Sequence, residues 1–200
     1  PCLRALVLRD LLRRKSSDAE LKELTSLRQG DPLAANLVAM QHEDGSWSSG
    51  DGAWRGSGSS IIMTAHALYR LGFMGFDDSF PPLARGAEYL FSRQQKNGAW
   101  PISRVEESEQ EDVSSSPMQT ALPLRALATC GYSLDPRAER AYHWLLEERL
   151  EDGSWPTGYA EGNMRGVAGY RRMAHSRWGC RSNTTAALQC MGQHPRLGRG

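Results

Sequence analysis

The pattern of apolar and polar positions predicts a chain built from helices. Three segments that begin near Pro32, Pro81 and Pro136 repeat apolar residues every three or four positions with charged residues between them, as amphipathic helices do. No segment alternates apolar and polar residues in the way that β-strands require, so the predicted fold class is all-α. Three other segments carry few charges and are expected to be inner helices: residues 61–71, 118–130 and 183–191.

A short motif follows each amphipathic segment and turns the chain into a repeat. Its tryptophans lie 53 and 55 positions apart, and its copies are Gln41–Trp47 (QHEDGSW), Gln94–Trp100 (QQKNGAW) and Arg149–Trp155 (RLEDGSW). We expect the glycine to end the preceding helix in a left-handed conformation, after which the tryptophan folds back over the helix end. A Thr-Ala pair marks the start of each inner helix: Thr64-Ala65, Thr120-Ala121 and Thr185-Ala186.

The repeating unit is therefore an outer helix, a Gly-Trp turn, a loop and an inner helix. Residues 31–192 hold three such units. Residues 1–30 are expected to form an N-terminal helical segment with one helix over 2–15, and residues 193–200 a flexible tail. Pro123 lies within the second inner helix, where we expect it to kink the helix or delay its start.

These repeats resemble the QW repeats of the terpene cyclase and protein prenyltransferase superfamily. The resemblance runs from about Asp31 to Met191, and residues 115–122 (SSPMQTAL) are similar to the S-T-P-S-Q-T-A-W segment of squalene-hopene cyclases. It implies an α/α toroid in which inner and outer helices alternate around an apolar cavity. A toroid of this family closes with about six helix pairs. Three pairs imply an incomplete or half toroid, which a second copy, a partner chain or the rest of a longer protein would complete.

The function that the resemblance implies is an isoprenoid or terpenoid enzyme, or an isoprenoid-binding domain. If catalytic, it would be of the isomerase or lyase type and would cyclise a polyprenyl substrate through carbocations. Squalene-hopene cyclases carry D-x-D-D-T-A at an inner helix, but none of the four residues directly before each Thr-Ala pair of this chain is acidic. A non-catalytic toroid-like module that binds a protein partner or a lipid is the alternative.

Metal and cofactor sites are not expected. The zinc-binding Asp-x-Cys of protein prenyltransferases corresponds to Trp178-Gly179-Cys180, with tryptophan in place of the acid. Magnesium is expected only if a diphosphate is bound. The ligand implied by the resemblance is an isoprenoid or another apolar small molecule.

Composition adds limits on partners and location. The 200 residues include 24 Lys and Arg against 23 Asp and Glu, so we expect no nucleic-acid binding. The four cysteines have no C-x-x-C spacing, and no leader sequence opens the chain, which favours reduced cysteines in a cytoplasmic protein. The basic helix over residues 2–15 leaves peripheral membrane contact open.

The balanced total hides two oppositely charged loops that precede the second and third inner helices. Residues 102–116 contain five acids and one arginine, and Asp112 and Glu111 are the candidate proton donors closest to the helix. Residues 162–182 contain no acid. The two loops either pair with each other or bind a ligand, in which case the arginines would grip an anionic head such as a diphosphate. These arginines are Arg165, Arg171, Arg172, Arg177 and Arg181.

Aromatic residues fall in the same loops. Trp54, Tyr170 and Trp178 either line a cavity, where their rings could stabilise a carbocation, or pack the loops onto the helix ends. His66, on the first inner helix, is either a catalytic base or a histidine that packs in the core or lines the cavity. Loops that join outer to inner helices meet at one end of such an array, so the candidate residues would share one rim.

Overall fold

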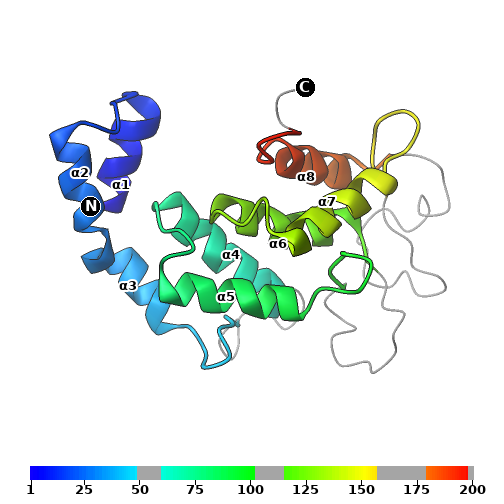
Figure 1. Cartoon of the computed structure of the whole chain (residues 1–200), viewed down its shortest axis with the longest axis horizontal. Coiled ribbons are helices and arrows are strands. Elements are labelled where there is room, and N and C mark those ends of the chain that lie inside the picture. The colour runs from blue at the N-terminus through cyan, green and yellow to red at the C-terminus, as the bar shows by residue number, and fades with distance from the viewer. Residues whose placement is uncertain (49–59, 102–114, 157–178, 198–200) are drawn as a thin grey trace.

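The computed structural model describes residues 1–48, 60–101, 115–156 and 179–197 (Figure 1). Within these ranges the chain forms eight α-helices, a π-helix over Val7–Leu11 and a 3₁₀ helix over Arg28–Gly30, and it contains no strand, which confirms the all-α prediction. The α-helices are α1 (Cys2–Leu6), α2 (Ala19–Ser26), α3 (Pro32–Ala39), α4 (Ser60–Phe73), α5 (Pro81–Ser92), α6 (Pro117–Thr129), α7 (Pro136–Glu147) and α8 (Arg181–Met191).

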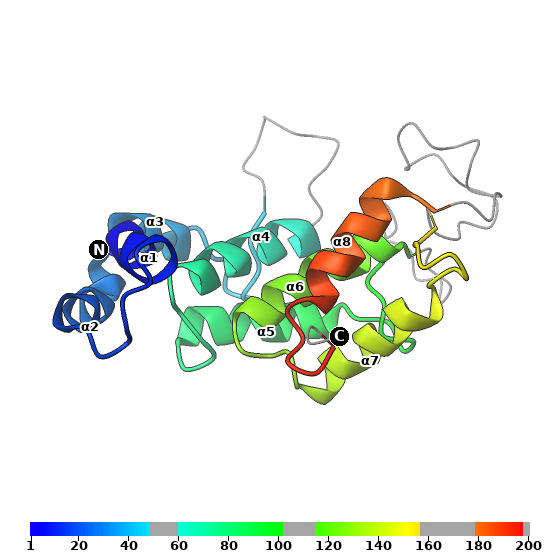
Figure 2. The ribbon, with the colours of Figure 1, turned by 90° about the horizontal axis from the view of Figure 1, so that it is seen from above.

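The predicted inner helices form one layer. Helix α6 lies between α4 and α8 and packs against both, while α5 packs against α4 and α7 packs against α6 (Figures 1 and 2). Residues that face these contacts are fully buried, such as Leu68 of α4, Leu90 of α5 and Leu124 of α6. The alternation of inner and outer helices that the repeat predicted is therefore present in the described part of the chain.

The helix starts follow from their capping residues. The carboxylates of Asp31 and Asp135 accept backbone N–H groups in the first turns of α3 and α7, and a proline occupies the first position of each helix. Ser116 caps α6 in the same way through the N–H of Gln119. Helix α6 begins at Pro117 and continues through Pro123, so the expectation of a late start is wrong. The cap at Ser116 fixes the first turn before the proline is reached.

Each motif tryptophan joins an outer helix to an inner helix. The indole Nε1 of Trp47, Trp100 and Trp155 donates to the carbonyl oxygen of the residue ten positions earlier, near the end of the preceding outer helix, at 2.7, 2.7 and 2.6 Å. These carbonyls lie in the last turns, where intrahelical donors run out. The tryptophans therefore fold back over the helix ends as the sequence predicts.

The backbone N–H of each tryptophan donates to a threonine at the start of the following inner helix. The acceptors are the Oγ1 atoms of Thr64, Thr120 and Thr184, at 2.9, 3.2 and 3.0 Å. The Thr-Ala pattern predicts Thr185 for the third unit, which is one position away from the observed acceptor. The pair Thr184-Thr185 offers two threonines before an alanine, and sequence spacing alone does not distinguish them.

Replacing Thr184 with valine is expected to destabilise the protein by about 1 to 2 kcal/mol, because the Trp155 N–H loses its acceptor. Valine at position 185 is the matched control. Thr185 is exposed and should tolerate the change within about 0.5 kcal/mol. Urea unfolding of the two variants measures both effects, and equal effects would contradict the assigned register.

The motif glycines have the predicted backbone conformation but a different position. Gly45, Gly98 and Gly153 all have φ between +84° and +97°. The outer helices already end at Ala39, Ser92 and Glu147, and the residues that follow them are right-handed, so the glycines do not cap the helices. They form the tight turn that reverses the chain before the tryptophan.

Two of these turns also form a hydrogen bond to the start of the next outer helix. Gln41 Nε2 donates both to the Gly45 carbonyl within its own turn and to the Pro82 carbonyl at the start of α5, at 2.9 and 2.8 Å. Gln94 repeats this arrangement with Gly98 and with Arg137 of α7. In the third copy Arg149 donates to the Gly153 carbonyl at 3.2 Å, and no further outer helix follows among the described residues.

The N-terminal segment differs from the single helix predicted over residues 2–15. Helix α1 ends at Leu6 and passes into the π-helix, which ends at Leu11, so residues 12–15 are not helical. In the tail, residues 193–197 are described, and His194 is buried beside Tyr142 and Glu139 of α7. All four cysteines are buried, and none forms a disulfide in the structure.

Candidate functional site

The side of the inner helices turned away from α5 and α7 carries the candidate site. Here a pocket of about 280 Å³ lies between α6 and α8, and a second of about 300 Å³ lies between α4 and α6. Both are lined by Leu122 and Arg125, so they adjoin along α6. We call this surface the inner-helix face. Its other lining residues include Met118, Ala121 and Ala186 in the first pocket and Ala65, His66 and Tyr69 in the second.

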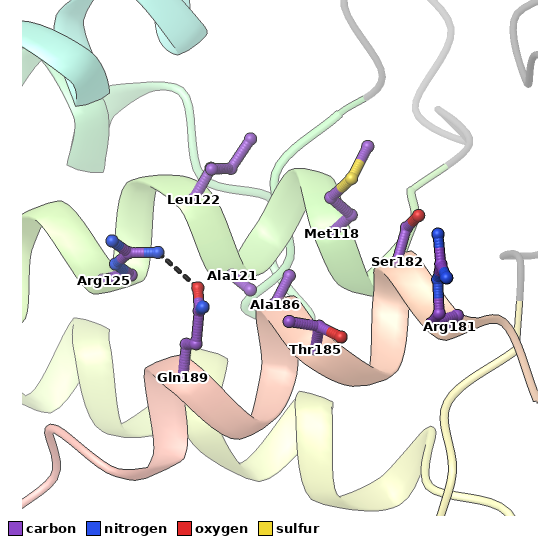
Figure 3. A pocket seen from close by; sticks show the side chains of 9 residues that line it. All are labelled: Met118, Ala121, Leu122, Arg125, Arg181, Ser182, Thr185, Ala186 and Gln189. Carbon is purple, nitrogen blue, oxygen red and sulfur yellow. Dashed lines mark hydrogen bonds between the residues drawn. The ribbon is translucent and has the colours of Figure 1, made fainter.

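Arg125 ties the three inner helices together on this face. Its NH1 atom donates to Gln189 Oε1 of α8 at 2.5 Å, and its NH2 atom donates to the hydroxyl of Tyr69 on α4 (Figure 3 shows the bond to Gln189). The guanidinium carbon lies 4.3 Å from the centre of the Tyr69 ring, so the cation also stacks on the aromatic face. These contacts hold the arginine in one orientation.

The inner-helix face is electropositive in the part of the chain that the structure describes. Arg70 and Arg181 accompany Arg125 among the residues that line the two pockets, and no aspartate or glutamate does. Partial burial and the nearby charges of Arg70 and Arg125 lower the pKa of His66 below its ordinary value, although the side chain stays exposed. The imidazole is therefore neutral at neutral pH, and the face presents fixed cations beside apolar side chains.

Two of the predicted site residues lie on this face. His66 lines the pocket between α4 and α6, and Arg181, the first residue of α8, lines the other. No carboxylate is among the lining residues of the described helices, so the structure does not pair His66 with an acid.

The other candidates lie outside the described residues. They belong to residues 49–59, 102–114 and 157–178, and the predictions made for them stay predictions. They are Asp112, Glu111, Arg165, Arg171, Arg172, Arg177, Trp54, Tyr170 and Trp178.

Arg125 is the functional candidate that sequence reasoning missed. It lies in a helix with few charges, and a single arginine there breaks the apolar pattern at a position that faces away from the outer helices. That break was the available signal. Tyr69 and Gln189 carried no signal, because their partner lies on another helix more than fifty positions away along the chain.

The described ranges contain no group of three or more histidine, cysteine, aspartate or glutamate residues placed to hold a metal ion. None of the described helices has the length and apolar character needed to span a bilayer.

Comparison with known proteins gives one family. The model of the squalene-hopene cyclase C-terminal domain matches residues 32–173. Lanosterol synthase from Pneumocystis carinii is 39% identical over 77 residues, which are 35% of this chain and 11% of that protein. A probable squalene-hopene cyclase from Sinorhizobium fredii is 32% identical over 125 residues, 60% of this chain and 18% of that protein. The matches thus span less than a fifth of these curated relatives.

Solved structures give weaker likenesses. A protein from Actinoplanes aligns over 100% of this chain and 55% of its own, with a TM-score of 0.49 and 19% identity. A family 10 polysaccharide lyase from Cellvibrio cellulosa aligns over 89% of this chain and 66% of its own, with a TM-score of 0.41 and 12% identity.

Proposed function

Because this chain belongs to the squalene-hopene cyclase C-terminal domain family, we propose that its inner-helix face binds an isoprenoid molecule as one wall of a larger cavity. The observation that carries the proposal is the pair of adjoining pockets on α4, α6 and α8, which share Leu122. Apolar side chains such as Met118, Leu122 and Ala186 would cover a hydrocarbon chain, and their burial by the ligand would drive binding.

Catalysis is the finer part of the proposal. Cyclisation of a polyprenyl substrate needs a proton donor, and the pocket-lining residues of the described helices include no carboxylic acid. Glu111 and Asp112 would have to supply it, because they precede α6 by only a few positions. Trp54, Tyr170 and Trp178 would then surround the developing carbocation. If the inner-helix face binds the isoprenoid without cyclising it, the proposal needs no residue outside the described ranges.

A non-catalytic module that binds a protein partner remains the second candidate. The third Gly-Trp turn supports it, because its counterparts at Gly45 and Gly98 each seat an outer helix whereas no described helix covers Gly153. A helix from a second copy or a partner chain would fit this position and extend the array, as a half toroid requires.

Binding is tested with two uncharged isoprenoids, farnesol and squalene. At a ligand concentration of about 100 Kd we expect at least one of them to raise the melting temperature by about 5 to 10 °C. Leu122→Gln should remove most of this shift, because it puts a polar amide where both pockets meet.

The matched control is Leu146→Gln on the outer helix α7, an exposed leucine that lines neither pocket. This variant should keep the full shift. The absence of any shift with both compounds would contradict isoprenoid binding, and an equal loss of the shift in the two variants would contradict binding at the inner-helix face.

A further inference from the structure

Arg125 is a half-buried cation without a carboxylate partner among the described residues. Its two hydrogen-bond acceptors are a phenol and an amide, and both are neutral. Ion pairs elsewhere in the described chain do not involve it; Arg137, for comparison, pairs with both Glu88 and Asp135. A guanidinium that loses part of its hydration pays a desolvation free energy, and no negative charge among its described neighbours offsets it here. Binding an anion would supply the missing charge.

The geometry leaves several N–H donors of this guanidinium available for an anion. Its NH1 atom donates one hydrogen to Gln189, and its NH2 atom donates one hydrogen to Tyr69. The Nε–H and the second hydrogens of both terminal nitrogens have no described acceptor. Because stacking on Tyr69 fixes the plane, the remaining donors form a planar fork of the kind that matches phosphate oxygens. Little side-chain entropy remains to be lost when an anion binds.

The surroundings favour an anion attached to an apolar chain. The two pockets meet at Arg125 and Leu122, so a charged head on the arginine would have apolar side chains within reach. Arg70 and Arg181 add positive charge from α4 and α8. Partial burial, and after it the charges of Arg70 and Arg125, lower the pKa of His66, which agrees with the positive charge of this face.

We propose that Arg125 binds the phosphate group of an isoprenoid phosphate, with the isoprenoid chain lying over Leu122 on the inner-helix face. The inference rests on the isoprenoid binding proposed above and names the ligand class more closely. Tyr69 and Gln189 act as positioning residues that hold the guanidinium.

Three probes separate the parts of this ligand: farnesyl phosphate, farnesol and inorganic phosphate. Farnesyl phosphate should bind at least tenfold more tightly than farnesol, because a charge-assisted contact is added to the same apolar chain. Inorganic phosphate should bind far more weakly than farnesyl phosphate, since it has no apolar part. Arg125→Gln should weaken farnesyl phosphate binding by about ten- to a hundredfold and leave farnesol binding nearly unchanged.

The control for the charge change is Arg140→Gln on α7. Arg140 is exposed and lines neither pocket, so its loss should leave all affinities unchanged. Equal affinities for farnesol and farnesyl phosphate would overturn the role of Arg125 while leaving isoprenoid binding intact. Failure of farnesyl phosphate, farnesol and squalene alike to bind would overturn the proposed function itself. Inorganic phosphate binding as tightly as farnesyl phosphate would show a simple anion site instead.

A second measurement needs no substitution and stays informative if Arg125→Gln does not fold. An anion beside Arg125 offsets the positive charges that lower the pKa of His66, so that pKa should rise when farnesyl phosphate binds. Farnesol should not raise it. An NMR titration of the histidine ring follows this directly, and an unchanged pKa in the farnesyl phosphate complex would place the phosphate away from Arg125.

Discussion

Trp100→Ala should destabilise the protein by about 3 to 5 kcal/mol, a large part of the stability of a domain of this size. The side chain is fully buried, and its removal leaves a cavity between an outer and an inner helix. The substitution also removes the indole hydrogen bond to the Leu90 carbonyl of α5, whereas the backbone N–H that donates to Thr120 Oγ1 of α6 remains. Thermal and urea unfolding measure the loss.

Trp100→Phe separates packing from hydrogen bonding. It keeps an aromatic ring but removes the indole N–H, and the Leu90 carbonyl still accepts the Arg93 N–H at 3.1 Å. We therefore expect a loss of about 1 kcal/mol from the hydrogen bond, with an added cavity term for the smaller ring. A loss as large as that of the alanine variant would mean that the hydrogen bond, and not the packing, joins the two helices.

Much of this fold could be predicted because its signals are local. Asp31-Pro32 and Asp135-Pro136 carry a cap and a first-turn proline side by side in the sequence, and both start helices in the structure. The tryptophans could be assigned to the helix ends because the distance from helix to motif is the same in every copy. A contact that recurs at constant sequence separation is visible without coordinates.

The details that could not be predicted depend on contacts between helices. Thr184 is distinguished from Thr185 by its hydrogen bond with the Trp155 N–H. The number of residues between the tryptophan and its threonine differs among the three copies, so sequence spacing does not identify the acceptor. The glycines were placed at helix ends because a left-handed glycine is most often a cap. The observed role of Gly45 and Gly98, to let the next outer helix approach, depends on backbone atoms forty or more positions away.

The candidate site was predictable only in outline. The repeat identifies the inner helices and hence the face that would line a cavity, and His66 and Arg181 do lie there. Charge counting, however, drew attention to the arginine-rich loop and away from Arg125, a single arginine in an apolar helix. Its importance comes from the two neutral partners that hold it, and these lie on other helices.

Gly98→Ala should destabilise the protein by about 2 to 4 kcal/mol, through two additive causes. At φ +97° any Cβ is strained, which accounts for about 1 to 2 kcal/mol. The added carbon would also lie 2.6 Å from the carbonyl oxygen of Arg140 in α7, and this backbone atom cannot move unless the outer helix shifts. The shift would weaken the hydrogen bond from Gln94 to the start of α7. Urea unfolding should therefore report the sum of the strain and the clash.

Two other glycines separate these causes. Gly131 has φ +96° but no atom within 4 Å of the added carbon, so Gly131→Ala should show only the backbone strain, about 1 to 2 kcal/mol. Gly153 has φ +84°, and the carbon would meet only the flexible side chain of Arg149 at 2.9 Å. Its alanine variant should therefore resemble that of Gly131, although Gly153 is the motif glycine. If Gly98→Ala and Gly153→Ala lower the free energy of unfolding equally, the motif glycine is required by the turn alone. The close approach of the next outer helix would then contribute nothing to the need for glycine.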